Sequence, residues 1–177
     1  NQQSLIYAAA GVETIATGNF RNVRNFDPEI FTERDDDEIR RRGIWYYDGN
    51  SLCEFKTQQL NLAYKRNLKD YFGPYSEYCE ELLNSDRPAN QPWGEDEAFR
   101  HFFFFLRKQW LEFETVDISE RIDYAINLLE DVEAHIYELK NQGFRLGRRA
   151  FDEDIIEASL SSLIAIKNDR KYDILDL

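Results

Sequence analysis

An unbroken run of apolar residues, spaced alternately four and three apart, constrains the fold of this chain more than any other feature. Its members are Ile118, Ile122, Ala125, Leu129, Val132, Ile136 and Leu139. This spacing extends over about three heptads and places the side chains on one face of a helix. We therefore expect a long helix, closed near Lys140 and Gly143, whose seam meets another helix within the chain or across a subunit boundary.

The rest of the sequence also favours helices separated by short irregular pieces. Glycine and proline number only 8 and 4 in 177 residues, and they stand where breaks are expected. The further predicted helices cover residues 4–17, 28–43, 52–72, 75–84, 95–114 and 152–167. The chain is therefore predicted to be all-α, an irregular helical bundle of about six or seven helices.

Aromatic residues concentrate in the segment 95–114. One helical stripe there consists of Phe99, Phe103, Leu106, Trp110 and Phe113, and the middle of the segment also contains Phe102, Phe104 and Phe105. A helix that is apolar on nearly every side usually lies buried at the centre of a bundle. We expect this helix to occupy that central position.

Two stretches break the helical pattern. At 44–50, aromatic residues are followed by Asp48 and Gly49, which predicts a small β-hairpin or a tight aromatic turn. At about 85–94, two prolines and a final glycine cannot continue a helix. Because neither half has enough apolar residues for a core of its own, we expect residues 1–177 to form a single helical domain with 85–94 as an internal loop.

Composition excludes several classes of protein. The 34 acidic and 22 basic residues give a formal charge of −12, which disfavours a nucleic-acid partner, while 42% hydrophobic residues suffice for a packed core. The longest apolar run, 102–106, is far shorter than a membrane span, so no membrane insertion is expected. Cys53 and Cys79 are predicted to be reduced thiols, as in the cytoplasm, another reducing compartment or a virion.

No catalytic motif is visible. The sequence lacks a phosphate-binding loop, a dinucleotide fingerprint, a nucleophile elbow and a zinc-protease motif, so no catalytic residue and no cofactor are assigned. The two histidines each follow a carboxylate by four residues, in the pairs Glu97 with His101 and Asp131 with His135. Such pairs could build a metal site between helices, but helical di-iron proteins use a three-residue spacing, so surface or capping ion pairs are the favoured interpretation and no metal ligand is assigned.

The candidate binding residues are aromatic and basic. Four aromatic residues in expected turns are predicted to contact a protein partner because exposed loop aromatics often serve as interface hot spots: Trp45, Tyr46, Tyr47 and Trp93. The glycine-bearing loop 143–149 contributes three arginines that could grip an anion or an acidic partner: Arg145, Arg148 and Arg149. The favoured interpretation of this loop is nevertheless a helix C-cap whose arginines offset the helix dipole and the acidic residues that follow.

Three function classes follow, in decreasing order of support. The first is a non-catalytic helical protein that acts through protein contacts, as an assembly or adaptor subunit or as a homo-oligomer. The second is an acidic inhibitor or immunity-type protein that neutralises a basic partner, which the −12 charge favours. The third is a helical-bundle metal protein or enzyme built on Glu97, His101, Asp131 and His135.

Overall fold

The computed structural model describes residues 3–12, 14, 44–147, 151 and 153–173. Within these residues the chain is mostly helical with one two-stranded antiparallel sheet, as the sequence predicts. The elements are α1 (Gln3–Ala9), β1 (Trp45–Asp48), β2 (Cys53–Lys56), α2 (Thr57–Tyr64), η2 (Lys69–Tyr71), α3 (Glu80–Asn84), η3 (Pro88–Asn90), α4 (Glu95–Thr115), α5 (Arg121–Asn141) and α6 (Glu153–Asp173). The helix predicted over 28–43 lies outside the described residues.

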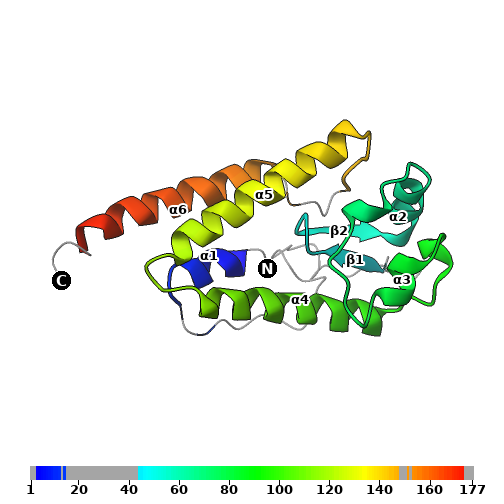
Figure 1. The fold of residues 1–177 in the computed structure, drawn as a ribbon, viewed down its shortest axis with the longest axis horizontal. Helices are drawn as coiled ribbons and strands as arrows, with labels where there is room; N and C mark the ends of the chain where they lie inside the picture. Colours follow the sequence, from blue (N-terminus) through cyan, green and yellow to red (C-terminus); the bar gives the residue numbers. More distant parts are fainter. Residues whose placement is uncertain (1–2, 13, 15–43, 148–150, 152, 174–177) are drawn as a thin grey trace, which may run out of the picture.

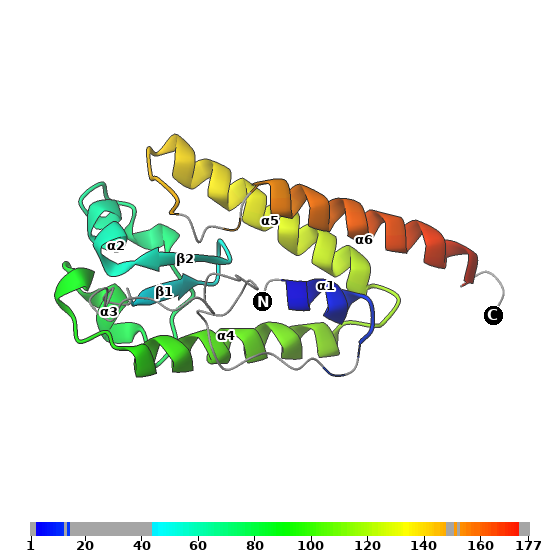
Figure 2. The ribbon, with the colours of Figure 1, turned by 180° about the vertical axis from the view of Figure 1, so that it is seen from behind.

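Three long helices frame the molecule, and shorter elements fill the space between them. Figures 1 and 2 show α4 along one side and the α5–α6 pair along the other, with α1 and the hairpin between these two layers. Helix α1 contacts all three long helices, and β1 packs on α4. The short helices α2 and α3 gather at the end of the molecule where α4 begins. No described helix is both long and apolar enough to cross a bilayer.

The seam predicted over 118–139 is confirmed as the buried face of α5. Six of its seven members are buried, from Ile122 to Leu139. Helices α1 and α6 pack against α5 within the same chain. The exception is Ile118, which is 60% exposed because α5 begins only at Arg121. In front of the helix, the Asp117 carboxylate accepts hydrogen bonds from the backbone N–H and the hydroxyl of Ser119.

Helix α4 begins at Glu95, as predicted, but it does not lie at the centre of a bundle. Its N-terminus is capped by the Glu97 carboxylate, which accepts a hydrogen bond of 3.0 Å from the Gly94 backbone N–H. Phe102 and Phe105 face the hairpin and are buried, whereas Phe103 and Phe104 are 36% and 39% exposed. The centre is taken instead by the hairpin, and α4 covers one side of it.

The helix predicted over 52–72 is wrong at both ends, because α2 ends at Tyr64 and only the short 3-10 helix η2 follows it. Residues 53–56 form β2, which pairs with β1 in the register Trp45 to Lys56 and Asp48 to Cys53. The Asp48 carboxylate stabilises the intervening turn by accepting bonds from the backbone N–H and hydroxyl of Ser51, at 2.9 and 2.6 Å. Helix therefore starts only at Thr57, and the helix predicted over 75–84 likewise shrinks to Glu80–Asn84.

Candidate functional site

The structure buries the aromatic residues that the sequence offered as a binding surface. Trp45, Tyr46 and Tyr47 are at most 6% exposed, and Trp93 is 7% exposed. Both faces of the hairpin are covered, so its aromatic side chains belong to the core rather than to an exposed turn. The exposure assumed for these residues is therefore wrong, and a role for them in partner binding stays a prediction.

A buried polar network lies around the hairpin and fixes it to α4. The carbonyl oxygen of Tyr47 is 2.7 Å from Nε2 of His101, so Nε2 carries a proton and donates to it. Nδ1 of His101 is 2.8 Å from the Ser76 hydroxyl. A histidine beside a serine can act as the base that activates a nucleophile. Here, however, His101 is fully buried and Ser76 is only 4% exposed. The pair is therefore closed to a substrate and serves packing.

Asp48 extends this network to the loop after η2. Its Oδ1 accepts a hydrogen bond of 2.9 Å from the Gly73 backbone N–H, in addition to the two bonds from Ser51. Burial disfavours the charged carboxylate and raises the pKa of Asp48 to about 6, although these three donors act in the opposite direction. This buried acid holds the hairpin turn against the neighbouring loop.

Two residues of the metal hypothesis, Glu97 and His101, have other structural roles. Glu97 caps α4, and both ring nitrogens of His101 are engaged with Ser76 and Tyr47. His135 is half-buried beside the Tyr71 ring, and Asp131 is exposed. Within the described residues, no three His, Cys, Asp or Glu side chains are grouped closely enough to hold a metal ion.

The basic loop after α5 begins as a helix C-cap. Gly143 adopts a φ of 74°, and its N–H and that of Phe144 donate to carbonyl groups of the last helical turn. The carbonyl of Gly143 accepts a bond from the Arg66 guanidinium. Arg145 is exposed and lines a hollow of about 250 Å³ beside α2. Arg148 and Arg149 lie outside the described residues, and an anion-binding role for the loop stays a prediction.

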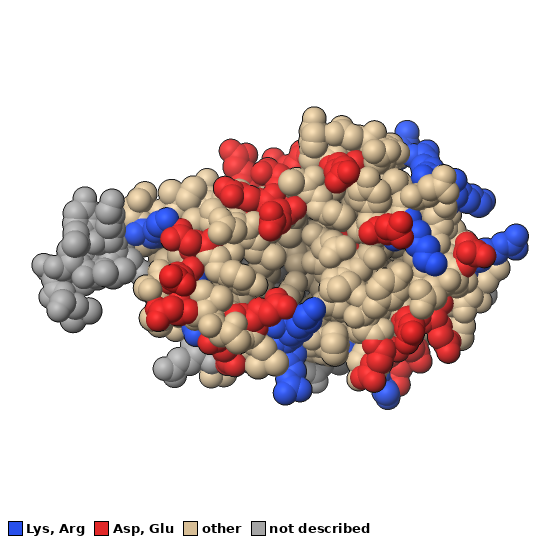
Figure 3. Space-filling view, viewed as in Figure 1, with Lys and Arg blue, Asp and Glu red and all other residues tan. Residues whose placement is uncertain are grey.

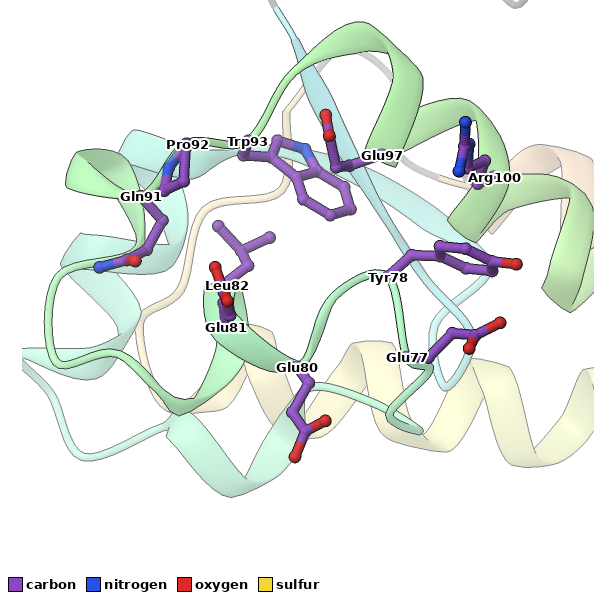
Figure 4. A pocket seen from close by; sticks show the side chains of 10 residues that line it. All are labelled: Glu77, Tyr78, Glu80, Glu81, Leu82, Gln91, Pro92, Trp93, Glu97 and Arg100. Carbon is purple, nitrogen blue, oxygen red and sulfur yellow. The ribbon is translucent and has the colours of Figure 1, made fainter.

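A different surface, at the end of the molecule formed by α3 and the start of α4, combines a cavity with charge. The cavity measures about 320 Å³, and Figure 4 shows the indole of Trp93 projecting into the space between α3 and α4. We call it the Trp93 cavity. Four of its ten lining residues are glutamates and one is an arginine. The glutamates are Glu77, Glu80, Glu81 and Glu97.

An aromatic hollow adjoins the Trp93 cavity. Tyr75 and Phe104, which are 49% and 39% exposed, line a wide hollow of about 630 Å³. Glu77 and Glu80 line both spaces, and the Tyr78 ring of the cavity packs edge-on against Phe104 at 6.3 Å between ring centres. The cavity and the hollow therefore form one continuous surface, which we call the α3–α4 surface.

Charge on this surface is predominantly negative. In Figure 3, acidic side chains gather at the end of the molecule where Figure 1 places α3 and the first turns of α4. Arg100, the arginine of the cavity, is 3.4 Å from the carboxylate of Asp96, which is not among the cavity residues. The Tyr78 hydroxyl bonds to the Glu77 carboxylate, which raises the pKa of Tyr78. The cavity thus keeps an excess of carboxylates around two aromatic rings.

Sequence reasoning missed the α3–α4 surface except for Trp93. The helix predicted over 75–84 includes Tyr75 and Tyr78, whereas both lie in the loop that leads into α3. The available signal was the composition of 75–81, in which two tyrosines alternate with three glutamates and which follows a glycine and a proline. Such a stretch is typical of an exposed turn with anchors for a partner.

Comparisons with known proteins returned no relative. No family model matches the chain, and neither the curated proteins nor the solved structures contain a match. The site must therefore be interpreted from its own geometry.

Proposed function

We propose that this chain is a non-catalytic helical protein-binding subunit that joins a larger assembly through the α3–α4 surface. One observation carries the proposal: Tyr75 and Phe104 expose aromatic surface over a wide hollow that is continuous with the Trp93 cavity. Aromatic anchors next to a concave, polar-rimmed surface are typical of protein interfaces. The burial of the His101–Ser76 pair removes that pair as a candidate for catalysis.

The test is a comparison of complexes formed in the native cells by matched variants. Tyr75→Ser with Phe104→Ser removes both aromatic anchors, and Leu62→Ala with Leu111→Ala removes two side chains that are 59% and 45% exposed on other surfaces. Affinity purification followed by mass spectrometry identifies the proteins bound to each form. We expect the parent and the Leu62/Leu111 variant to retain the same complex, and the Tyr75/Phe104 variant to lose it.

Two results would contradict this proposal. One is a parent chain that sediments as a monomer and retains no specific protein. The other is a complex that persists unchanged when Tyr75 and Phe104 are both replaced. If the complex proves to be a homo-oligomer, sedimentation of the same variants shows whether the α3–α4 surface forms the contact.

The acidic inhibitor remains the second candidate because carboxylates surround the Trp93 cavity. Such a protein should release its basic partner steeply as ionic strength rises, since exposed charges separated by more than about 8 Å are screened at physiological salt. An assembly subunit anchored by Tyr75 and Phe104 should remain bound at high salt. A salt titration of the purified complex therefore separates the two functions.

A further inference from the structure

The Trp93 cavity has the chemistry to receive one positively charged side chain. We propose that it binds an arginine presented by a basic peptide segment of the partner protein, an inference that rests on the protein-binding function proposed above. Its volume of about 320 Å³ is at the lower end of the 300–1,000 Å³ common for ligand sites. It therefore has room for one long side chain and a short length of backbone, and not for a folded element.

The charge of the cavity favours a cation. Four glutamates and one arginine are among its lining residues, and the carboxylates of Glu77, Glu80 and Glu81 belong to exposed residues. Arg100 is itself 3.4 Å from Asp96. Because Glu77 already accepts from the Tyr78 hydroxyl, a guest guanidinium can form two parallel hydrogen bonds to the carboxylate of Glu80 or Glu81, which a lysine ammonium cannot do.

The aromatic rings of the cavity favour arginine over a simple cation. Tyr78 and Trp93 line the same space, and Figure 4 shows the Trp93 indole directed into it and the Tyr78 ring at its edge, on the side of Glu77 and Arg100. A planar guanidinium stacks on such rings while its edge stays free to bond carboxylates. A metal ion lacks this stacking contact, and the described residues offer no metal-binding group.

An unpaired donor on Trp93 gives a second indication, that the guest carries a hydrogen-bond acceptor. Its side chain is 7% exposed, and its Nε1–H has no hydrogen-bond acceptor in the structure. An unpaired buried donor is costly, so a ligand that supplies an acceptor gains binding energy. A backbone carbonyl beside the arginine supplies one. Because Nε1 is itself covered, we expect the indole to turn slightly when that carbonyl binds.

The test uses two small probes that differ in charge but have nearly the same shape: N-acetyl-arginine N-methylamide and its citrulline counterpart. Each is titrated into the ¹⁵N-labelled full chain, and binding is followed at the indole N–H peaks of the three tryptophans. Trp93→Phe identifies the Trp93 peak. We expect the arginine probe to shift that peak saturably, with an apparent affinity about tenfold higher than that of the citrulline probe.

Matched variants locate the binding. The double variant Glu80→Gln with Glu81→Gln should bind the arginine probe with an affinity about fivefold lower, because it removes two exposed carboxylates from the cavity. Glu130→Gln with Glu133→Gln makes the same charge change at exposed positions of α5 and should leave the affinity unchanged. Equal responses to the two probes, or equal affinities in the two variants, would overturn the inference. A Trp93 peak that does not shift would overturn it as well.

The outcomes separate this inference from the function on which it rests. If the arginine probe does not bind while replacement of Tyr75 and Phe104 still abolishes the native complex, the α3–α4 surface is an interface but the Trp93 cavity does not bind arginine. If the probe binds as expected while that double replacement leaves the complex intact, the cavity binds arginine but the proposed assembly contact is wrong.

Discussion

Nδ1 of His101 lies 2.8 Å from the hydroxyl oxygen of Ser76, and this contact joins α4 to the loop that leads into α3. The opposite ring nitrogen donates to the carbonyl of Tyr47 in β1. One fully buried side chain therefore ties together the helix, the loop and the hairpin. Because Tyr75 and Tyr78 lie in that same loop, the network also sets the position of the α3–α4 surface.

Replacing His101 by phenylalanine should destabilise the protein although it preserves a ring of similar size. The variant removes the ring nitrogens from the Tyr47 carbonyl and from the Ser76 hydroxyl, which keeps only a contact of 3.5 Å with the Cys79 sulfur, and a buried group left unpaired costs about 1 to 3 kcal/mol. Urea unfolding of both proteins measures the difference. Ser76→Ala, which removes one side of the same network, should cost less. Equal stability of His101→Phe and the parent would show that these bonds contribute nothing.

The α5 seam predicts a contrast between two of its own members. Leu129 is 3% exposed, and Leu129→Ala should lower the free energy of unfolding by about 2 to 5 kcal/mol. Ile118 belongs to the same periodic run but is 60% exposed, so Ile118→Ala should change the stability by about 0.5 kcal/mol or less. Thermal unfolding of the two variants checks the contrast. Similar shifts for both would contradict the packing of α5 described above.

The sequence predicted the long helices well because their signals are local. The seam of α5 and the aromatic turn before Gly49 each lie within a few residues of the element that they specify. The β2 strand was missed because Leu52 and Phe55 also fit a helical spacing. Residues 53–56 form a strand because they pair with β1 and because Asp48 stabilises the turn, and the spacing of apolar residues shows neither interaction.

The candidate site was harder to predict because the run 102–105 fits more than one helical stripe. Of the expected stripe, only Phe113 is buried, and α4 buries Phe102 and Phe105 in place of Phe99 and Phe103. The choice depends on the position of the hairpin, against which Phe102 and Phe105 pack. Since that position is fixed by long-range contacts, periodicity alone could not show which phenylalanines stay exposed.

Both cysteine thiols should be unreactive in the folded protein. Cys53 and Cys79 are fully buried, and burial raises the pKa of Cys53 to about 12 and also raises that of Cys79. A thiol reagent such as dithionitrobenzoate at pH 8 should therefore react at the rate at which the protein opens. Adding denaturant should release two thiols promptly. Rapid reaction of either cysteine in the native protein would contradict its burial.

Asp48 gives the protein a stability that falls as the pH rises. The pKa of this acid is about 6 in the folded chain against an ordinary value of 3.8, so between these values the folded state binds more protons than the unfolded state. The contribution is present in full below the lower value and is lost as the pH rises through about 6. At about 1.4 kcal/mol per unit of pKa, the free energy of unfolding falls by about 3 kcal/mol over this pH range.

Asp48→Asn isolates this effect from the many surface carboxylates, which the two proteins share. The variant cannot titrate at this position, so its free energy of unfolding should vary less between pH 4 and pH 7 than that of the parent. It should also be less stable at pH 4, because an amide N–H₂ replaces one of the two oxygens that accept from Ser51 and Gly73. Urea unfolding at several pH values measures both quantities. Parallel pH profiles would show that Asp48 does not carry the shift, whereas a flatter profile for the variant assigns it to this carboxyl group.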